Sequence, residues 1–160
     1  MSVFFRCFLL LFLLTGLSPA QAETFTGRVV GVVDGDTITV LDTDHTQHKV
    51  RLTGIDAPER KQAFGTKAKQ HLASLVSGRT VTVEWFKRDR YQRILGKVMR
   101  DGQDVNLEQI RAGFAWHGYQ RDQLPADRPV YAEAAEASRL NGFGLWTDTR
   151  PIPPWDYRRK

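Results

Sequence analysis

The sequence predicts a β-rich α+β fold, a five-stranded Greek-key barrel with about three helices packed on it. Three observations predict this fold: three strand-like segments come first, one helix-like segment separates them from two more strands, and helix-like segments follow. Barrels of this kind belong to the OB type, which binds oligonucleotides on one face. No internal repeat or low-complexity tract interrupts the pattern, and the length suits a single domain with one core.

The first three strands are defined by residue alternation and by turn sequences. Residues 26–33 are rich in β-branched side chains and lead into Asp34-Gly35, a pair typical of a tight hairpin turn. Residues 37–41 alternate polar and apolar side chains and form the returning strand. Residues 48–52 form the third strand, and Pro58 keeps the loop after it out of the helical conformation.

The second half of the chain combines two strands with three helices. A helical period begins at Thr66, and Gly78 can end that helix. Residues 80–86 and 94–100 form the fourth and fifth strands, and Asp104 can cap the second helix. The third helix is expected from about Pro129 to Leu140. The residues expected to face inward are Ala68, Leu72, Leu75 and Val76 in the first helix, Leu107, Ile110 and Phe114 in the second, and Tyr131, Ala135 and Leu140 in the third.

The first 22 residues have the composition of a secretory signal peptide. Arg6 precedes an apolar run over residues 7–14, and Ala20-Gln21-Ala22 matches an Ala-x-Ala cleavage site. An uncleaved membrane anchor is the alternative, but the run is shorter than the ~20 residues that span a bilayer. The prolines near the C-terminus predict a tail that is not helical and lies extended or loose. The expected parts are a signal peptide at 1–22, an OB-fold domain at 23–148 and a Pro-rich basic tail at 149–160.

Charge and cysteine content narrow the class of partner. The chain has a formal net charge of +5 at neutral pH and one cysteine, Cys7, which leaves with the signal peptide. An exported, periplasmic or secreted protein without cysteine has no disulfide and no thiolate metal site. A basic exported protein suits a polyanionic partner such as nucleic acid, anionic lipid or cell-wall polymer, and charge alone does not choose among these.

Carboxylates gather in two short segments next to strand ends. Asp34 and Asp36 flank a turn glycine, and Asp56 and Glu59 follow the third strand. Two carboxylates from separate strand ends, with loop carbonyls nearby, are the oxygen ligands that Ca²⁺ accepts. Each residue also has an ordinary alternative, because turn aspartates, loop caps and loop glutamates are usually solvated. The histidines show no metal-ligand spacing and are expected on the surface or in the core.

Two arginines complete a set suited to phosphodiester cleavage. Arg51 lies on an alternating strand and is expected to point inward beside apolar residues, which is unfavourable for a charge without an anionic partner. Arg93 follows a charged run over residues 87–90, for which a solvated hairpin loop is the alternative. Two guanidiniums bind the extra charge of a pentacoordinate phosphorus, and a hard cation shares that charge. A nearby carboxylate orients or deprotonates the attacking water.

Three motifs together resemble the staphylococcal nuclease-like, or thermonuclease, family. The family pattern is Asp-Gly-Asp-Thr, then Arg-Leu-x-x-x-Asp-x-Pro-Glu, then Asp-x-Tyr-x-Arg. This chain carries the three motifs in that order and spacing at residues 34–37, 51–59 and 89–93. The resemblance extends over about residues 25–147, and the family fold is an OB barrel with helices.

The resemblance implies roles for the matched residues. It implies one Ca²⁺ bound by two carboxylates and a backbone carbonyl, a general base or water-positioning glutamate, two phosphate-clamping arginines, and residues that contact the nucleotide. The implied cation ligands are Asp36, Asp56 and Ala57, the implied catalytic residues are Arg51, Glu59 and Arg93, and the implied substrate-binding residues are Tyr91, Tyr119 and Arg90. Trp116 is either a further stacking residue or a core residue. The implied reaction is hydrolysis of DNA and RNA with little sequence preference, leaving 3′-phosphate ends.

Two departures from the family pattern affect the expected site. Gln92 replaces the glycine often found before the second arginine, which leaves the position of Arg93 open. The loop at 60–65 is also shorter than in the staphylococcal enzyme, which puts substrate contacts from that loop in doubt.

Two function classes remain in competition. The first is an exported, monomeric Ca²⁺-dependent nuclease that prefers single strands and has no stable membrane association after signal cleavage. The second is an OB-fold nucleic-acid-binding or interaction module that has lost catalysis. Such a module is expected to lose acidic or arginine positions of the motifs, and all of them are present here. A lipid-binding or cell-wall-binding protein would explain the charge but not the motifs.

Overall fold

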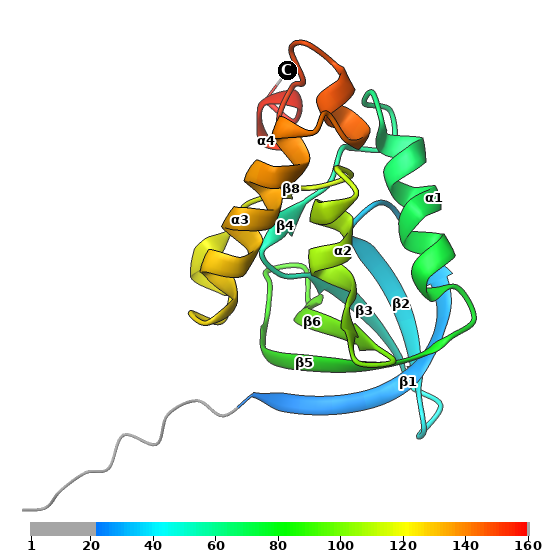
Figure 1. Cartoon of the computed structure of the whole chain (residues 1–160). Helices are drawn as coiled ribbons and strands as arrows, with labels where there is room; N and C mark the ends of the chain where they lie inside the picture. The colour runs from blue at the N-terminus through cyan, green and yellow to red at the C-terminus, as the bar shows by residue number, and fades with distance from the viewer. Residues whose placement is uncertain (1–21, 160) are drawn as a thin grey trace, which may run out of the picture.

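The computed structural model describes residues 22–159, so the expected signal peptide lies outside the described residues except for Ala22. Five strands in the order β3-β2-β1-β5-β6 form one sheet, and a parallel pairing of β3 with β6 closes it into a barrel (Figure 1). The predicted OB-type barrel is thus confirmed. The strands are β1 (Glu23–Val32), β2 (Thr37–Asp42), β3 (Gln47–Leu52), β4 (Ile55–Asp56), β5 (Thr80–Arg88), β6 (Ile94–Arg100), β7 (Gln103–Asp104) and β8 (Trp116–His117).

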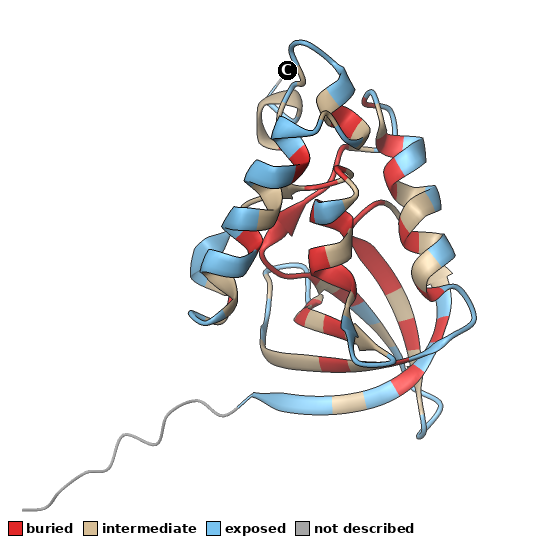
Figure 2. Ribbon diagram, viewed as in Figure 1, coloured by how far each residue is buried: buried red, intermediate tan, exposed pale blue. Residues whose placement is uncertain are grey.

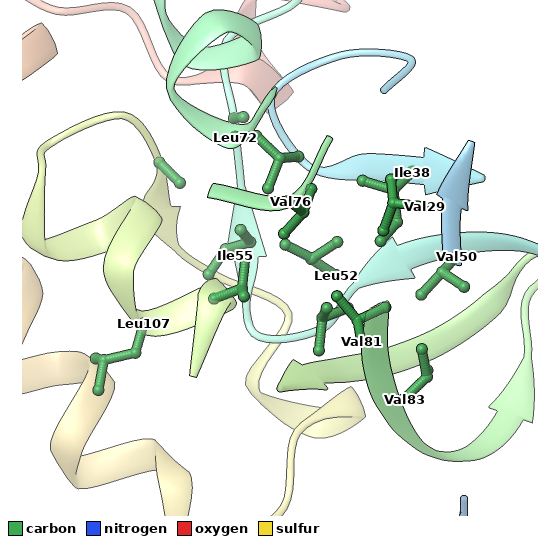
Figure 3. Packing of buried hydrophobic residues seen from close by; sticks show 14 of the residues in the cluster. Val29, Ile38, Val50, Leu52, Ile55, Leu72, Val76, Val81, Val83 and Leu107 are labelled. Carbon is green, nitrogen blue, oxygen red and sulfur yellow. The ribbon is translucent and has the colours of Figure 1, made fainter. Parts of the chain in front are cut away.

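The barrel interior is filled by alternate residues of its strands. Ile38 and Val40 of β2 and Val50 and Leu52 of β3 are fully buried, while Thr39 and Arg51, which lie between them in sequence, are less buried. Figure 3 shows the side chains of Ile38, Val50 and Leu52 together with those of β5 and of the first helix. The period-two pattern in the sequence therefore predicted the barrel core because each strand buries only one face.

Helices cover one end of the barrel. Helix α2 contacts both α1 and α3 and lies between them (Figure 1). Buried residues follow the barrel interior and the helix faces turned toward it (Figure 2). Across residues 22–159, no helix is both long and apolar enough to cross a bilayer. The helices are α1 (Gly65–Val76), α2 (Val105–Arg111), α3 (Asp127–Leu140) and α4 (Pro154–Tyr157), with 3₁₀ turns η1 (Gln120–Asp122) and η2 (Gly144–Thr147).

The predicted cap of α2 is confirmed. The Asp104 carboxylate accepts a hydrogen bond from the backbone amide of Leu107 (3.0 Å), which satisfies a donor of the first turn. The same carboxylate accepts a hydrogen bond from the hydroxyl of the buried Tyr131 on α3 (2.7 Å). One aspartate thus starts a helix and joins it to its neighbour.

Two expectations about the C-terminal half are wrong. Leu140 was expected to face inward, but it is the last residue of α3 and is 74% exposed, because the helix has already passed the core at that point. The tail was expected to be non-helical, but residues Pro154–Tyr157 form α4. Proline is compatible with the first helical position, where its missing N–H has no partner to lose.

Candidate active site

All nine residues predicted for the site line one cleft of about 610 Å³ at an end of the barrel. The cleft is built from the turn before β2, the end of β3, the β4 segment with the loop after it, and the hairpin between β5 and β6. The segment before η1 contributes Tyr119, so residues from five separate parts of the sequence meet in one place. The nine are Asp36, Arg51, Asp56, Ala57, Glu59, Arg90, Tyr91, Arg93 and Tyr119.

Asp36 is placed by a tightly packed turn. A Cβ atom at Gly35 would lie 2.7 Å from the Cβ atoms of Ala57 and Ala68, so only glycine allows the turn to approach α1 this closely. The buried side chain of Gln109 on α2 donates a hydrogen bond to the Gly35 carbonyl (2.6 Å). The Asp36 carboxylate then accepts a hydrogen bond from the backbone amide of Ala57 (2.7 Å). The turn therefore brings Asp36 and the backbone of Ala57 together.

Arg51 lies between the two aspartates expected to bind the cation. Its side chain is only 11% exposed, and its guanidinium contacts Asp36 Oδ1 (3.2 Å) and Asp56 Oδ1 (3.0 Å). It also donates hydrogen bonds to the carbonyls of Leu52 (2.7 Å) and Ile55 (2.9 Å). The unfavourable position inferred from the sequence is thus resolved by two carboxylates and two backbone acceptors.

Asp56 belongs to the short β4–β8 ladder and is 1% exposed. Burial raises the pKa of its carboxyl group; the hydrogen bond from Arg158 and the charge of Arg51 oppose that rise. Asp34, beside Asp36, is affected in the same sense: burial and repulsion by Asp36 raise its pKa to about 6. Burial is the largest cause of both rises, and a bound cation would oppose it by favouring the charged carboxylates.

The donor set fits a hard divalent cation. Asp36 and Asp56 approach the same guanidinium, and the backbone amide of Ala57 donates to Asp36, so the two carboxylates and the Ala57 backbone lie close together. Over the described part of the chain, no group of three His, Cys, Asp or Glu side chains is arranged to hold a metal ion. Two carboxylates with a backbone carbonyl and water still form the all-oxygen environment that Ca²⁺ accepts.

Glu59 lies on the loop between β4 and α1, and that loop is held by Gln62. The Gln62 side chain accepts a hydrogen bond from the Glu59 amide (3.0 Å), and the Gln62 amide donates to the Glu59 carbonyl (2.8 Å). A Cβ atom at Gly65 would lie 1.9 Å from the Glu59 carbonyl oxygen, so the loop also requires glycine there. The Glu59 carboxylate accepts a hydrogen bond from Arg158 Nη1 (2.6 Å).

Arg93 lies at the end of the β5–β6 hairpin and is held by Asp89. Its Nε contacts Asp89 Oδ2 (2.7 Å), and its backbone amide donates to Asp89 Oδ1 (3.0 Å). Gln92 adopts a left-handed conformation with φ of 62°, the backbone that glycine adopts readily. The hairpin therefore forms with glutamine at this position, and the parallel pairing of β6 with β3 sets it beside the strand of Arg51.

Aromatic side chains surround the mouth of the cleft. Tyr91 is 65% exposed and lies under the guanidiniums of Arg90 (4.8 Å to the ring centroid) and Arg93 (5.5 Å). Tyr119 is also exposed and lies 5.6 Å from the Arg51 guanidinium. Trp116 does not line the cleft; it is half-buried and packs against Trp146 and Trp155.

Sequence reasoning missed several residues that shape the site. Arg158 enters the cleft from the C-terminal tail, and its hydrogen bonds to Asp56 raise its own pKa. Asp89 orients Arg93, and Gln62 and Gln109 hold the two loops that carry carboxylates. Asp89 belongs to the third motif and was recognisable from it. Arg158 and Gln109 have no local signal, because each acts on a segment far away in the sequence. Gln62 lies only three residues after Glu59, but no motif marks it.

Comparisons with known proteins agree with the geometry. A family model described as "Staphylococcal nuclease homologue" matches residues 49–148. A protein named "Uncharacterized endonuclease" from Escherichia coli is 45% identical over 143 residues, covering 89% of this chain and 90% of that protein. One of the same name from Haemophilus influenzae is 42% identical over 153 residues, covering 94% and 83%. A "Micrococcal nuclease" from Shigella flexneri is 41% identical over 150 residues, covering 88% and 84%. The chain therefore belongs to the staphylococcal nuclease homologue family, and it is a nuclease, a hydrolase acting on phosphodiester bonds.

Proposed function

We propose that the chain is an exported, Ca²⁺-dependent endonuclease that cleaves DNA and RNA with little sequence specificity and leaves 3′-phosphate ends. One observation carries this proposal: two guanidiniums, the two aspartates expected to bind the cation and a loop glutamate line the same cleft. A module that only bound nucleic acid would gain from the arginines. It would have no use for buried carboxylates, which repel phosphate.

The arginines supply the electrostatic part of the mechanism. Arg51 and Arg93 donate hydrogen bonds to the non-bridging oxygens of the scissile phosphate, and they bind these oxygens more strongly as negative charge develops on them. Arg51 is already oriented by four acceptors, so little reorganisation is needed at the moment of reaction. When bound, the cation supplies further charge neutralisation at the phosphate and a place for water.

Glu59 orients or deprotonates the attacking water. It accepts the proton of the water, or orients it, as the water oxygen attacks phosphorus from the side opposite the leaving group. The bond between phosphorus and the 5′ oxygen then breaks, and the 5′ oxygen leaves as a hydroxyl after protonation. The phosphate remains on the 3′ oxygen, which gives the expected 3′-phosphate end.

The mouth of the cleft supports a preference for single strands. Tyr91 and Tyr119 expose aromatic faces beside arginines, and unpaired bases stack on such faces by about 1–3 kcal/mol each. A paired base cannot reach an aromatic face without leaving its stack. Denatured DNA should therefore be digested faster than duplex DNA under the same conditions.

The chelator assay tests the cation requirement. Purified protein should digest denatured DNA in millimolar Ca²⁺, and an excess of a Ca²⁺ chelator should abolish digestion. Equal digestion with the chelator would rule out the metal mechanism. The end group of the products should be released by a phosphatase specific for 3′-phosphates.

The proposed role of Glu59 is tested by Glu59→Gln. We expect turnover to fall by about 10²- to 10⁴-fold, as for removal of a general base, with the folded structure retained because the side chain lies on a loop. Glu108→Gln is a matched control, because Glu108 is a surface glutamate paired with Arg111 on α2. Unchanged turnover in Glu59→Gln would place water activation on another residue.

Export rests on the sequence of residues 1–22. We expect N-terminal sequencing of protein recovered from outside the cytoplasm to begin at Glu23. Protein that remained in the cytoplasm and began at Met1 would overturn this part of the proposal.

A further inference from the structure

The C-terminal segment is docked against the active-site loops by several contacts. The Gln62 side chain, which holds the Glu59 loop, also donates a hydrogen bond to the Ile152 carbonyl (2.6 Å). Pro154 is buried, and Trp155 packs edge-on against Trp116 with ring centroids 5.6 Å apart. Trp116 in turn pairs with Asp56 in the β4–β8 ladder. The segment is therefore tied to the Glu59 loop and to the β4–β8 ladder that carries Asp56.

This docking directs Arg158 into the cleft. Its Nη1 and Nη2 donate hydrogen bonds to Asp56 Oδ1 (3.2 Å) and Oδ2 (2.7 Å), so both oxygens of that carboxylate are engaged. Nη1 also donates to Glu59 Oε1 (2.6 Å), and Nη2 donates to the Tyr119 hydroxyl (2.9 Å). One guanidinium thus contacts an expected cation ligand, the expected water-handling group and an expected substrate contact.

We propose that the C-terminal segment is an autoinhibitory latch, in which Arg158 and the activating cation compete for Asp56. This inference rests on the proposed cation site and goes beyond it by assigning a regulatory function to the tail. While Arg158 is docked, its guanidinium occupies Glu59 Oε1, so that oxygen cannot hold the attacking water. Cation binding and release of Arg158 are then one coupled event.

The strength of the contacts suits a reversible latch. The Arg158 side chain is 39% exposed, so water can replace its hydrogen bonds as it leaves. The cation and the guanidinium are both positive, and both require the same buried carboxylate, so each weakens the binding of the other. Reciprocity follows from thermodynamic linkage: removing Arg158 must tighten cation binding by the factor by which the cation loosens Arg158.

The first test compares Ca²⁺ binding by Arg158→Gln and Arg159→Gln, measured by calorimetric titration of the purified protein without substrate. Arg159 is the matched control, because it carries the same charge at the next position but pairs with Asp156 on its own helix and is 73% exposed. We expect Arg158→Gln to bind Ca²⁺ about 5- to 150-fold more tightly than the wild type, the range of typical coupled sites. Arg159→Gln should bind it like the wild type.

The second test separates docking from simple charge. Trp155→Ala removes the aromatic contact of the segment with Trp116 and changes no charge, so it should also tighten Ca²⁺ binding. In the double variant Arg158→Gln with Trp155→Ala, the second substitution should add nothing, because the latch is already lost. An equal gain from Trp155→Ala in both backgrounds would show an effect unrelated to Arg158 and would overturn the latch.

Failure of the latch is distinguishable from failure of the proposed function. If wild type and Arg158→Gln bind Ca²⁺ with equal affinity, the cation site stands and the latch is wrong. If Ca²⁺ affinity is equal and Arg158→Gln only weakens binding of single-stranded DNA, Arg158 is a third phosphate contact and the latch is again wrong. If neither protein binds Ca²⁺, both the latch and the proposed cation site are wrong.

Discussion

The two phosphate-clamping arginines lie in one cleft but are held in opposite ways. Arg51 lies on the cleft floor, formed by Asp36, Arg51 and Asp56, where its guanidinium has two carboxylate and two backbone partners and little exposure. Arg93 lies on the hairpin rim, formed by residues 89–93, where one aspartate holds it and much more of it is exposed. The floor belongs to the barrel, whereas the rim is a hairpin that projects from it.

Because of this difference, the contribution of each arginine to catalysis need not match its contribution to the stability of the fold. On the floor, removal of one partner leaves buried charges uncompensated, so the geometry of the site and the stability of the barrel are linked. On the rim, water can replace a lost partner, so the hairpin can change with little cost to the fold. Both arginines can matter equally for turnover while differing widely in their effect on unfolding.

The largest expected difference is in the free energy of unfolding of Arg51→Ala and Arg93→Ala. Each should lower turnover by about 10²- to 10³-fold, as does removal of one transition-state donor. Arg51→Ala should also lower the free energy of unfolding by about 3–5 kcal/mol, because Asp36 and Asp56 lose a buried partner. Arg93→Ala should lower it by about 1 kcal/mol or less. Urea unfolding and single-turnover digestion measure the two quantities.

A surface arginine provides the control for that comparison. Arg111 on α2 is exposed and pairs with Glu108 three residues earlier. Arg111→Ala should leave turnover unchanged and alter stability by about 0.5 kcal/mol at most. Equal stability losses in Arg51→Ala and Arg93→Ala would contradict the distinction between floor and rim.

A smaller effect is expected from Asp89→Asn, which keeps the side-chain oxygen of the hairpin but removes the charge that orients Arg93. Turnover should fall by about 3- to 10-fold, because an exposed pair contributes about 1 kcal/mol and Arg93 itself remains. The wild-type pair should persist at neutral pH. Burial tends to raise the pKa of Asp89, but hydrogen bonds from Arg93 and Tyr91 outweigh it and hold that pKa below its ordinary value.

The sign of the pH dependence follows from that lowered pKa. A carboxyl group whose pKa is lowered by folding stabilises the protein above its unfolded pKa, and the stabilisation is lost as pH falls through the lowered value. The stability difference between wild type and Asp89→Asn should therefore be constant at neutral pH and shrink in strong acid. A difference that grew as the pH fell would show that another group holds Arg93.

The smallest effect is expected from Gln92→Gly. Gln92 has a φ of 62°, which costs a non-glycine residue about 1 kcal/mol or more, while glycine loses more backbone entropy on folding. The relief of backbone strain and the added entropy cost of glycine nearly cancel, so the free energy of unfolding should rise by about 1 kcal/mol or less. Turnover should change by about twofold at most. Thermal unfolding with a turnover assay measures both. A large gain in turnover would show that glutamine holds Arg93 away from its working position.

Much of the cleft floor was predictable because its residues belong to short sequence motifs. The need of Arg51 for anionic partners was predictable, and the structure supplies Asp36 and Asp56 as those partners. Its expected direction was wrong, because Val50 and Leu52 on either side of it fill the barrel interior and Arg51 lines the cleft instead. The cap at Asp104 was predictable for the same reason, since a cap depends on residues only three positions apart. Local spacing determines such features directly.

The errors and omissions lie where distant segments meet. The prolines of the tail suggested an extended chain, but burial of Pro154 and packing of Trp155 on Trp116 stabilise a helical turn. Leu140 fits the apolar face of α3 by spacing, yet it extends beyond the core. Helical periodicity specifies a face and not how far along the helix that face remains covered.

The sequence by itself determined the family, the OB barrel and the residues expected to bind cation and phosphate, because motifs and strand alternation act over a few residues. Only the tertiary structure decided that Arg158 contacts Asp56 across 102 positions of sequence and that Gln62 joins the Glu59 loop to the tail. Such contacts depend on how barrel, helices and tail pack together. A guanidinium has no preferred partner in sequence, and it binds whichever carboxylates the fold brings within reach.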